Sequence, residues 1–346
     1  MEVDLQPAKS VSLWPDPCLT ANLYCNRRLP PMARDVLGPL ASDLAAAGTT
    51  AESFFWFTRY GKCGEHLKVR VHGDESIAAA ARDSLEIHAR RFFASPAADA
   101  GDEAWISKSA IPALDLEDEL EGDYPNKTLL WTHYRRSPVV FGADVYLPDD
   151  VHVERFCRCQ AAVTSIALGV LLPKLEDPAF AKHRQSTFLR ILITAMSVLG
   201  LSPAETAGYL AYHRDWLIRS LTHDVAPQGT SNDTVLAEIR ESAALTPAAV
   251  RPLTDHVANA LAASKPSTEY CRDFHRELSA FYQHVSTYRG NDHFDRDPFT
   301  RDFAFLPIFK VLHFAANQLG FRISNEAFVF DLLCRATEPL CPKAGD

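Results

Sequence analysis

None of the short motifs that mark nucleotide-dependent or zinc-dependent enzymes is present in this sequence. The 346 residues contain no G-x-G-x-x-G segment, no Walker loop, no G-x-S-x-G elbow and no H-E-x-x-H segment. These motifs supply a phosphate cradle, an exposed nucleophilic serine or two zinc ligands on one helix face. A dinucleotide-dependent, nucleotide-dependent or zinc-dependent mechanism therefore has no basis in this sequence.

The cysteines show neither a disulfide framework nor a zinc pattern. All eight are scattered along the chain, and reduced thiols are the default in a long chain with such spacing. Cys157 and Cys159 form a C-x-C pair near His152, but a closed tetrahedral site needs a donor that the neighbouring sequence does not supply. We therefore predict no metal site.

Positive charge is in deficit, and signals for membrane targeting are missing. The net charge is −9 and the pI is about 5.8, which argues against nucleic acid or an anionic membrane as a partner. The start, MEVDLQPAKS, lacks the basic-then-apolar pattern of a signal peptide, and no apolar run looks long enough to span a bilayer. We therefore expect a cytoplasmic protein with no membrane partner.

The patterns along the chain predict an α+β protein. Hydrophobic residues make up 47% of the sequence, which is enough to bury a sizeable core. Residues 1–150 are rich in strand patterns, residues 151–346 are mainly helical, and no repeat or linker separates them, so we expect one catalytic domain over 1–346. The predicted strands lie within 14–26 and at 54–57, 66–71, 127–132 and 137–141. The predicted helices cover 32–47, 75–93, 151–172, 177–200, 203–222, 231–243, 247–263, 267–288 and 303–320.

A strand with one basic face is the most informative segment. From His66 to Val71 the apolar Leu67, Val69 and Val71 alternate with basic or titratable residues. Since successive side chains of a strand point to opposite faces, one face is buried and the other carries cationic donors. Two interpretations remain open: a solvated edge strand that resists aggregation, or a row of donors facing a bound substrate. The second face consists of His66, Lys68 and Arg70.

The helix predicted over 303–320 is apolar on nearly every side, which is typical of a buried helix. Lys310, His313 and Asn317 stand at i, i+3 and i+7 and so share a face, and Gln318 follows them. Buried polar groups need partners or cost about 1–3 kcal/mol each. They are either a satisfied core histidine with its neighbours or a polar line facing a cavity, with His313 able to transfer protons near neutral pH.

Hydroxyl groups cluster on the helix predicted over 267–288. Tyr282, Ser286 and Tyr288 lie close together there, and a tyrosine hydroxyl can act as an acid or donate to a carbonyl oxygen. More often, such residues lie at the edge of the core on an ordinary amphipathic helix. The segment Tyr209–Trp216 is open to the same two interpretations.

The order of several segments resembles the C-terminal elimination domain of lantibiotic dehydratases and its small stand-alone relatives in thiopeptide biosynthesis. The resemblance covers nearly the whole chain, and it depends on the order of fragments that are individually short. They are Leu23-Tyr24-Cys25, Trp56–Gly61, His66–Arg70, Ser137-Pro138 with Phe141-Gly142-Ala143, Leu199–Pro203 and His313–Gly320.

Two branches of that family differ in chemistry, and three departures favour one of them. The elimination branch removes glutamate from glutamylated Ser or Thr and resembles HLRxR, R-Y-G-G and H-M-x-x-N-R at the corresponding places. Here Lys68, Val140 and Gln318 stand where arginines are expected. Lysine lacks the bidentate fork that binds a carboxylate, so the chain is more similar to the other branch, the thiopeptide pyridine synthases.

Membership of that branch implies a formal [4+2] aza-cycloaddition between two dehydroalanines of a modified precursor peptide. Dehydration and loss of the leader peptide then give a pyridine-centred macrocycle, without a cofactor. A ribosomally made precursor peptide with leader and azole-containing core is the implied partner, with possible contacts to other pathway enzymes. A glutamate-eliminating lyase and a non-catalytic leader-docking subunit are the alternatives. From the physical demands of this reaction we hypothesise that Arg70, Lys68, His66, Asn317 and Gln318 bind the substrate. We further hypothesise that the catalytic residues are His313, Tyr282, Tyr288 and Ser286.

Overall fold

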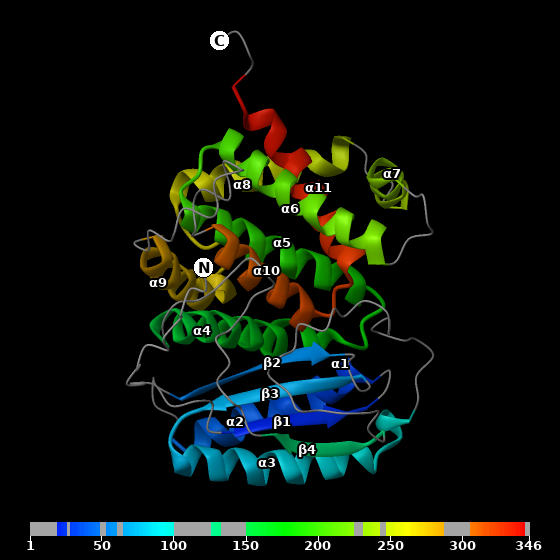
Figure 1. Cartoon of the computed structure of the whole chain (residues 1–346), viewed down its shortest axis with the longest axis vertical. Coiled ribbons are helices and arrows are strands. Elements are labelled where there is room, and N and C mark those ends of the chain that lie inside the picture. Colours follow the sequence, from blue (N-terminus) through cyan, green and yellow to red (C-terminus); the bar gives the residue numbers. More distant parts are fainter. Residues whose placement is uncertain are drawn as a thin grey trace, which may run out of the picture.

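The computed structural model combines one small antiparallel sheet with a larger set of helices (Figure 1). The predicted α+β class is therefore confirmed. The strand predicted at 137–141, the fragment Phe141-Gly142-Ala143 and Tyr288 lie outside the described residues. The structure describes residues 19–25, 28–48, 53–60, 65–99, 126–132, 150–224, 231–242, 247–286 and 305–342.

The sheet has four strands in the order β2-β3-β1-β4, and each neighbouring pair is antiparallel. In β3, Val69 lies opposite Ala21 of β1, and Lys68 lies opposite Asn22. The period of two therefore separates an apolar face from a polar face in both strands. The strands are β1 Leu19–Tyr24, β2 Phe54–Tyr60, β3 His66–His72 and β4 Thr128–Thr132.

Helix α3, Glu75–Phe93, lies along the sheet beside β1 and β3, whereas α4 lies beyond β2 on the other side (Figure 1). The Asp74 side chain accepts a hydrogen bond from the Ile77 amide at 3.0 Å and so caps the first turn of α3. Gly73 has a φ of +155°, and a Cβ there would come within 2.8 Å of the Ile77 side chain. Only glycine fits this close strand-to-helix turn.

Helices make up the rest of the described chain, and the predicted ones are all present with shifts of a few residues at their ends. The helical run predicted over 32–47 consists of α1 Leu29–Met32, the π-helical turn η1 Ala33–Leu37 and α2 Gly38–Ala46. A second π-helical turn, η3 Ala167–Leu171, and the 3-10 turn η4 Leu172–Lys174 follow α4. The long helices are α4 Asp150–Ile166, α5 Phe180–Leu199, α6 Pro203–Asp224, α7 Asn232–Ser242, α8 Pro247–Ala263, α9 Arg272–Ser286, α10 Phe305–Leu319 and α11 Ile323–Thr337.

Two predicted helix boundaries are confirmed, and hydrogen bonds and a backbone angle explain each of them. Ser202 and Glu205 form a capping box before α6, because Ser202 Oγ accepts from the Glu205 amide and Glu205 Oε2 accepts from the Ser202 amide. At the other boundary Gly320 has a φ of +82°, and the Phe321 amide donates back to the Ala316 carbonyl at 2.9 Å. This left-handed residue ends α10.

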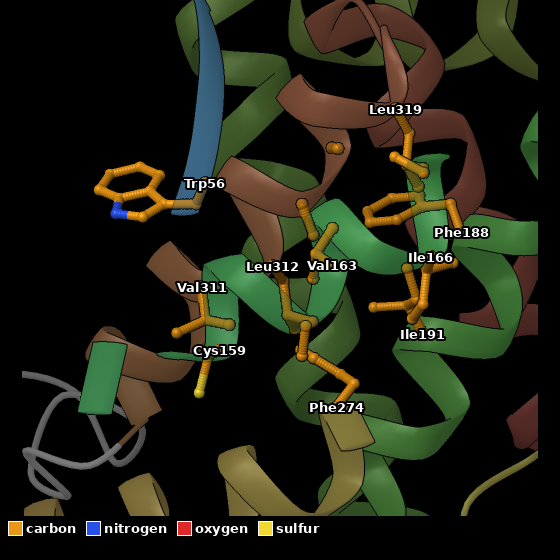
Figure 2. Packing of buried hydrophobic residues seen from close by; sticks show 14 of the residues in the cluster. Trp56, Cys159, Val163, Ile166, Phe188, Ile191, Phe274, Val311, Leu312 and Leu319 are labelled. Atoms are coloured by element: carbon orange, nitrogen blue, oxygen red, sulfur yellow. The ribbon is translucent and has the colours of Figure 1, made fainter. Parts of the chain in front are cut away.

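The core of the helical part lies where α4, α5, α9 and α10 meet (Figure 2). Val163 of α4, Phe188 of α5 and Leu312 of α10 are fully buried there. Their burial explains why α10 has so few polar residues, since almost every side of it contacts another element. Phe274 of α9 closes the same cluster.

One helical stretch of the described residues, Val151–Lys174, reaches the length and apolar composition of a membrane span, contrary to the sequence-based expectation. Of its apolar window, 61% is buried inside the protein. Its contacts with β2, α9 and α10 account for this composition, because a core helix must be apolar on most of its surface.

Candidate functional site

Strand β3 is an inner strand of the sheet, and its basic face is buried. It pairs with β1 on one side and with β2 on the other. The exposed fractions are 2% for His66, 0% for Lys68 and 3% for Arg70. The interpretation of this strand as a solvated edge is therefore wrong, because neither its backbone nor its basic face is open to water.

Arg70 is held against the aromatic face of Trp56 on β2. Its guanidinium carbon lies 4.5 Å from the centroid of the Trp56 ring, and its Nη1 donates to Thr58 Oγ1 at 3.3 Å. A desolvated cation above an indole gains roughly 2 kcal/mol. Arg70 is thus oriented by its own sheet.

His72, at the end of the same face, is a neutral imidazole. The Trp56 indole N–H donates to His72 Nε2 at 3.4 Å. Burial, together with the charges of Arg70 and Arg158, lowers the pKa of His72 to about 3. His72 therefore accepts from Trp56 and fixes the ring on which Arg70 lies.

Three aromatic side chains connect the sheet to α10, and we call Trp56, Phe156 and Phe314 the aromatic bridge. The Trp56 and Phe314 ring centroids are 6.3 Å apart, and Phe156 of α4 lies 5.6 Å from Phe314. Both contacts are edge-to-face, a favourable arrangement for aromatic pairs. Since Phe314 follows His313 directly, the bridge joins the end of the sheet that carries Arg70 to the part of α10 that carries His313.

His313 is oriented by a carboxylate that the sequence analysis did not find. Its Nδ1 lies 2.9 Å from Glu326 Oε2 and 3.1 Å from Oε1. The Glu326 side chain is 3% exposed and that of His313 is 29% exposed. A carboxylate only accepts hydrogen bonds, so Nδ1 carries the hydrogen and Nε2 is left as the basic nitrogen. We call this pair the His–Glu dyad, an arrangement suited to general acid–base catalysis.

A third element, α6, completes the surroundings of the dyad. The Trp216 ring lies 6.5 Å from the His313 ring, and the Lys310 ammonium lies 5.1 Å from the Trp216 centroid. Phe309 of α10 packs edge-on against Trp216 at 5.2 Å. The segment Tyr209–Trp216, which the sequence left ambiguous, therefore lies beside the dyad.

His213, one turn before Trp216, is buried and stacked flat on Phe309. The two rings are 4.0 Å apart with an interplanar angle of 3°, and neither ring nitrogen has a hydrogen-bond partner among the described residues. Burial, and then the charge of Lys310, lower the pKa of His213 well below its ordinary value. His213 therefore stays neutral in the folded protein.

Replacing His213 by phenylalanine should make the protein less sensitive to acid. In the unfolded chain His213 takes up a proton as the pH falls below 6.5, whereas in the folded chain it does not. Its contribution to stability is therefore present above pH 6.5 and is lost on acidification, by about 1.4 kcal/mol per pH unit. Urea unfolding at pH 7.5 and pH 5.0 should show a smaller fall for His213→Phe than for the wild type. Equal falls would contradict this account.

The side-chain amides of Asn317 and Gln318 form hydrogen bonds with other groups of the protein. Asn317 Oδ1 accepts from the Arg59 amide at 2.7 Å and its Nδ2 donates to the Arg59 carbonyl at 3.0 Å, so it clamps α10 to β2. Gln318, fully buried, accepts from Thr164 Oγ1 at 2.8 Å and donates to Gln160 Oε1 at 2.8 Å. Lys310, His313 and Asn317 thus contact three different elements, and substrate binding by Asn317 or Gln318 stays a prediction.

The hydroxyl residues predicted to be catalytic on α9 differ in their surroundings. Ser286 is exposed and donates to the Gln283 carbonyl at 3.0 Å. Tyr282 is partly buried against the core, and its neighbour Phe281 contacts Phe156 of the aromatic bridge at 6.3 Å. Their catalytic roles, like that of Tyr288, stay predictions.

Among the described residues no group of three or more His, Cys, Asp or Glu side chains could hold a metal ion. Cys157 is buried and Cys159 is fully buried. Burial raises the pKa of the Cys159 thiol well above its ordinary value, so this cysteine stays protonated.

The fold of this chain is similar to those of proteins with known structures. No family model and no curated protein matches the sequence. The pyridine synthase TbtD from thiomuracin biosynthesis superposes with a TM-score of 0.64 at 14% identity, over 93% of this chain and 97% of that protein. TsrL superposes with a TM-score of 0.53 at 14% identity, over 92% and 94%. The tRNA-dependent lantibiotic dehydratase MibB from Microbispora sp. 107891 reaches only 0.46 at 14% identity, over 97% of this chain and 29% of that protein. The chain therefore has a fold like that of the pyridine synthase TbtD, as its resemblance to that branch predicts.

Proposed function

We propose that this protein is a pyridine synthase of thiopeptide biosynthesis. It joins two dehydroalanines of a modified precursor peptide in a formal [4+2] aza-cycloaddition, loses water, releases the leader peptide and leaves a pyridine-centred macrocycle. The observation that carries the proposal is the His–Glu dyad, connected by the aromatic bridge to Arg70. The similarity in fold to TbtD supports it.

The first demand of this reaction is positioning, and we assign it to the basic face of β3. Two distant side chains of one peptide must be held in contact, and such an entropy trap can contribute several kcal/mol. Arg70, Lys68 and His66 are donors on a single strand face, spaced at every second residue. This spacing suits the backbone oxygens of an extended peptide. This face is buried, so the proposed binding requires that the side chains covering it move when the peptide enters.

The His–Glu dyad meets the second demand, which is proton transfer. The reacting dehydroalanine amide must tautomerise toward an imidic acid, and His313 Nε2 can accept its N–H proton while Glu326 stabilises the imidazolium. The same imidazolium can later return a proton when water or the leader amide departs. Tyr282, Tyr288 and Ser286 are the further proton donors of this proposal.

Gln318 argues against the competing role of a glutamate-eliminating lyase. An arginine at this position would bind a departing glutamate carboxylate, but the Gln318 amide is buried and bonded to Gln160 and Thr164 of α4. A neutral amide used in this way offers no bidentate site for a carboxylate.

Mass spectrometry after incubation with a dehydrated, azole-containing precursor peptide tests the proposal. We expect a macrocycle and a freed leader amide. Loss of glutamate from a glutamylated peptide would instead identify an elimination enzyme, and binding without turnover would identify a docking subunit. If Arg70→Ala and His313→Ala both cyclised at the wild-type rate, the assignment of the site would be wrong.

A further inference from the structure

Lys310 lies close to His313 but has no role in the mechanism proposed above. It lies one helical turn before His313 on α10, and its ammonium is 5.1 Å from the Trp216 ring centroid. Trp216 in turn contacts the His313 ring at 6.5 Å. All three side chains are partly buried, so each keeps some exposure to solvent.

The neighbours of Lys310 show toward which helix its ammonium group points. The Lys310 charge is the second cause, after burial, of the low pKa of His213 on α6. His213 stacks on Phe309 at 4.0 Å, and Phe309 also contacts Trp216. The ammonium therefore projects toward α6 over a packed aromatic floor, on the same side as the dyad.

We propose that Lys310 donates a hydrogen bond to the oxygen of the substrate amide whose N–H is deprotonated by His313. This inference depends on the proposed function and assigns it a further catalytic residue. His313 Nε2 takes the amide proton, and the electron pair of the broken N–H bond delocalises onto the amide oxygen. The Lys310 ammonium meets the negative charge on that oxygen, while Glu326 meets the positive charge on the imidazole.

The spacing of Lys310 and His313 on α10 suits a contact with both ends of one amide. A donor for the oxygen and a base for the nitrogen must approach the same planar group from neighbouring positions. Residues at i and i+3 of a helix lie on one face, about 5–6 Å apart at their Cβ atoms. The Trp216 ring, which contacts both side chains, offers a flat apolar surface for a planar amide.

The decisive variant is Lys310→Met, which keeps the length of the side chain and removes the charge. We expect the rate of macrocycle formation at saturating peptide to fall about 100-fold or more, since loss of one oxyanion donor costs 10²–10³ in kcat. Lys310→Arg should restore a substantial part of the rate. Lys182→Met, at an exposed position of helix α5, is the matched control and should cyclise at the wild-type rate.

A binding measurement gives a second, turnover-independent readout. A precursor peptide with a thioamide at the reacting position offers a weaker acceptor than the oxygen, so the wild type should bind it several-fold more weakly, and Lys310→Met should lose this preference. If the wild type and Lys310→Met form the macrocycle at the same rate, the role of Lys310 is wrong but the proposed function stands. A wild type that produces no macrocycle overturns the proposed function and this inference with it.

Discussion

His313→Asn should reduce the rate of macrocycle formation by about 10²–10⁴-fold, because it removes the proton acceptor of the dyad. Glu326→Gln should also reduce the rate, by a smaller factor, since its amide can present an N–H to Nδ1 and favour the wrong tautomer. Both effects should appear in kcat rather than KM if the dyad acts mainly in the transition state. Single-turnover mass spectrometry of the cyclised product measures both.

The chain contains a matched control for this prediction. His183 also lies 2.9 Å from a carboxylate, that of Asp177, but this pair is exposed on the surface. His183→Asn should cyclise at the wild-type rate. Equal losses in His183→Asn and His313→Asn would show that the effect is one of general structure, and an active His313→Asn would remove the dyad from the mechanism.

Asp331→Ala should destabilise the protein by about 3–5 kcal/mol. Asp331 of α11 is fully buried and accepts from two arginines: Arg214 of α6 at 3.1 Å, and Arg240 of α7, whose Nη2 lies 2.8 Å from Oδ1 and whose Nε lies 3.1 Å from Oδ2. Removing the carboxylate takes from Arg240 its buried partner and leaves Arg214 paired with the exposed Asp215. The free energy of unfolding in urea measures this loss.

Asp273→Ala provides the comparison. Asp273 also pairs with an arginine, Arg276, at 2.7 Å, but its side chain is 67% exposed. An exposed pair of this kind contributes about 0–1 kcal/mol. If Asp331→Ala costs no more than Asp273→Ala, the three-helix ion cluster does not stabilise the protein. Asp331→Ala could lower the free energy of unfolding strongly while its folded fraction still cyclises at the wild-type rate. That result would show that Asp331 stabilises α11 but is not needed to position Glu326.

The sequence predicted most of the helices because their apolar residues recur at the helical period over long stretches. It predicted the alternation of His66–Val71 equally well, since a strand with two unlike faces is unambiguous. It did not settle whether that strand lies at an edge, because strand order depends on pairings with residues far away in the sequence. Both faces of an inner strand can be covered, and only the tertiary structure shows this.

The partner of His313 was missed for a related reason. Helix α11 was not predicted, although Ala327, Phe330 and Leu333 recur at helical spacing after Gly320 and are buried. That periodicity was the available signal. Glu326 alone looks like an ordinary charged residue near a helix start, and its role depends on how α10 and α11 cross.

The His–Glu dyad joins residues only 13 positions apart, across the turn between α10 and α11, whereas Asn317 clamps α10 to a strand 258 positions away. Closing a short loop costs little chain entropy, so a helical hairpin of this kind forms early, while long-range pairing with the sheet comes late. The His–Glu dyad and the contact between α10 and the sheet are thus assembled by folding events of very different contact order. Substitutions that slow the docking of the sheet should leave the dyad formed in a partly folded protein whose sheet has not yet packed against α10.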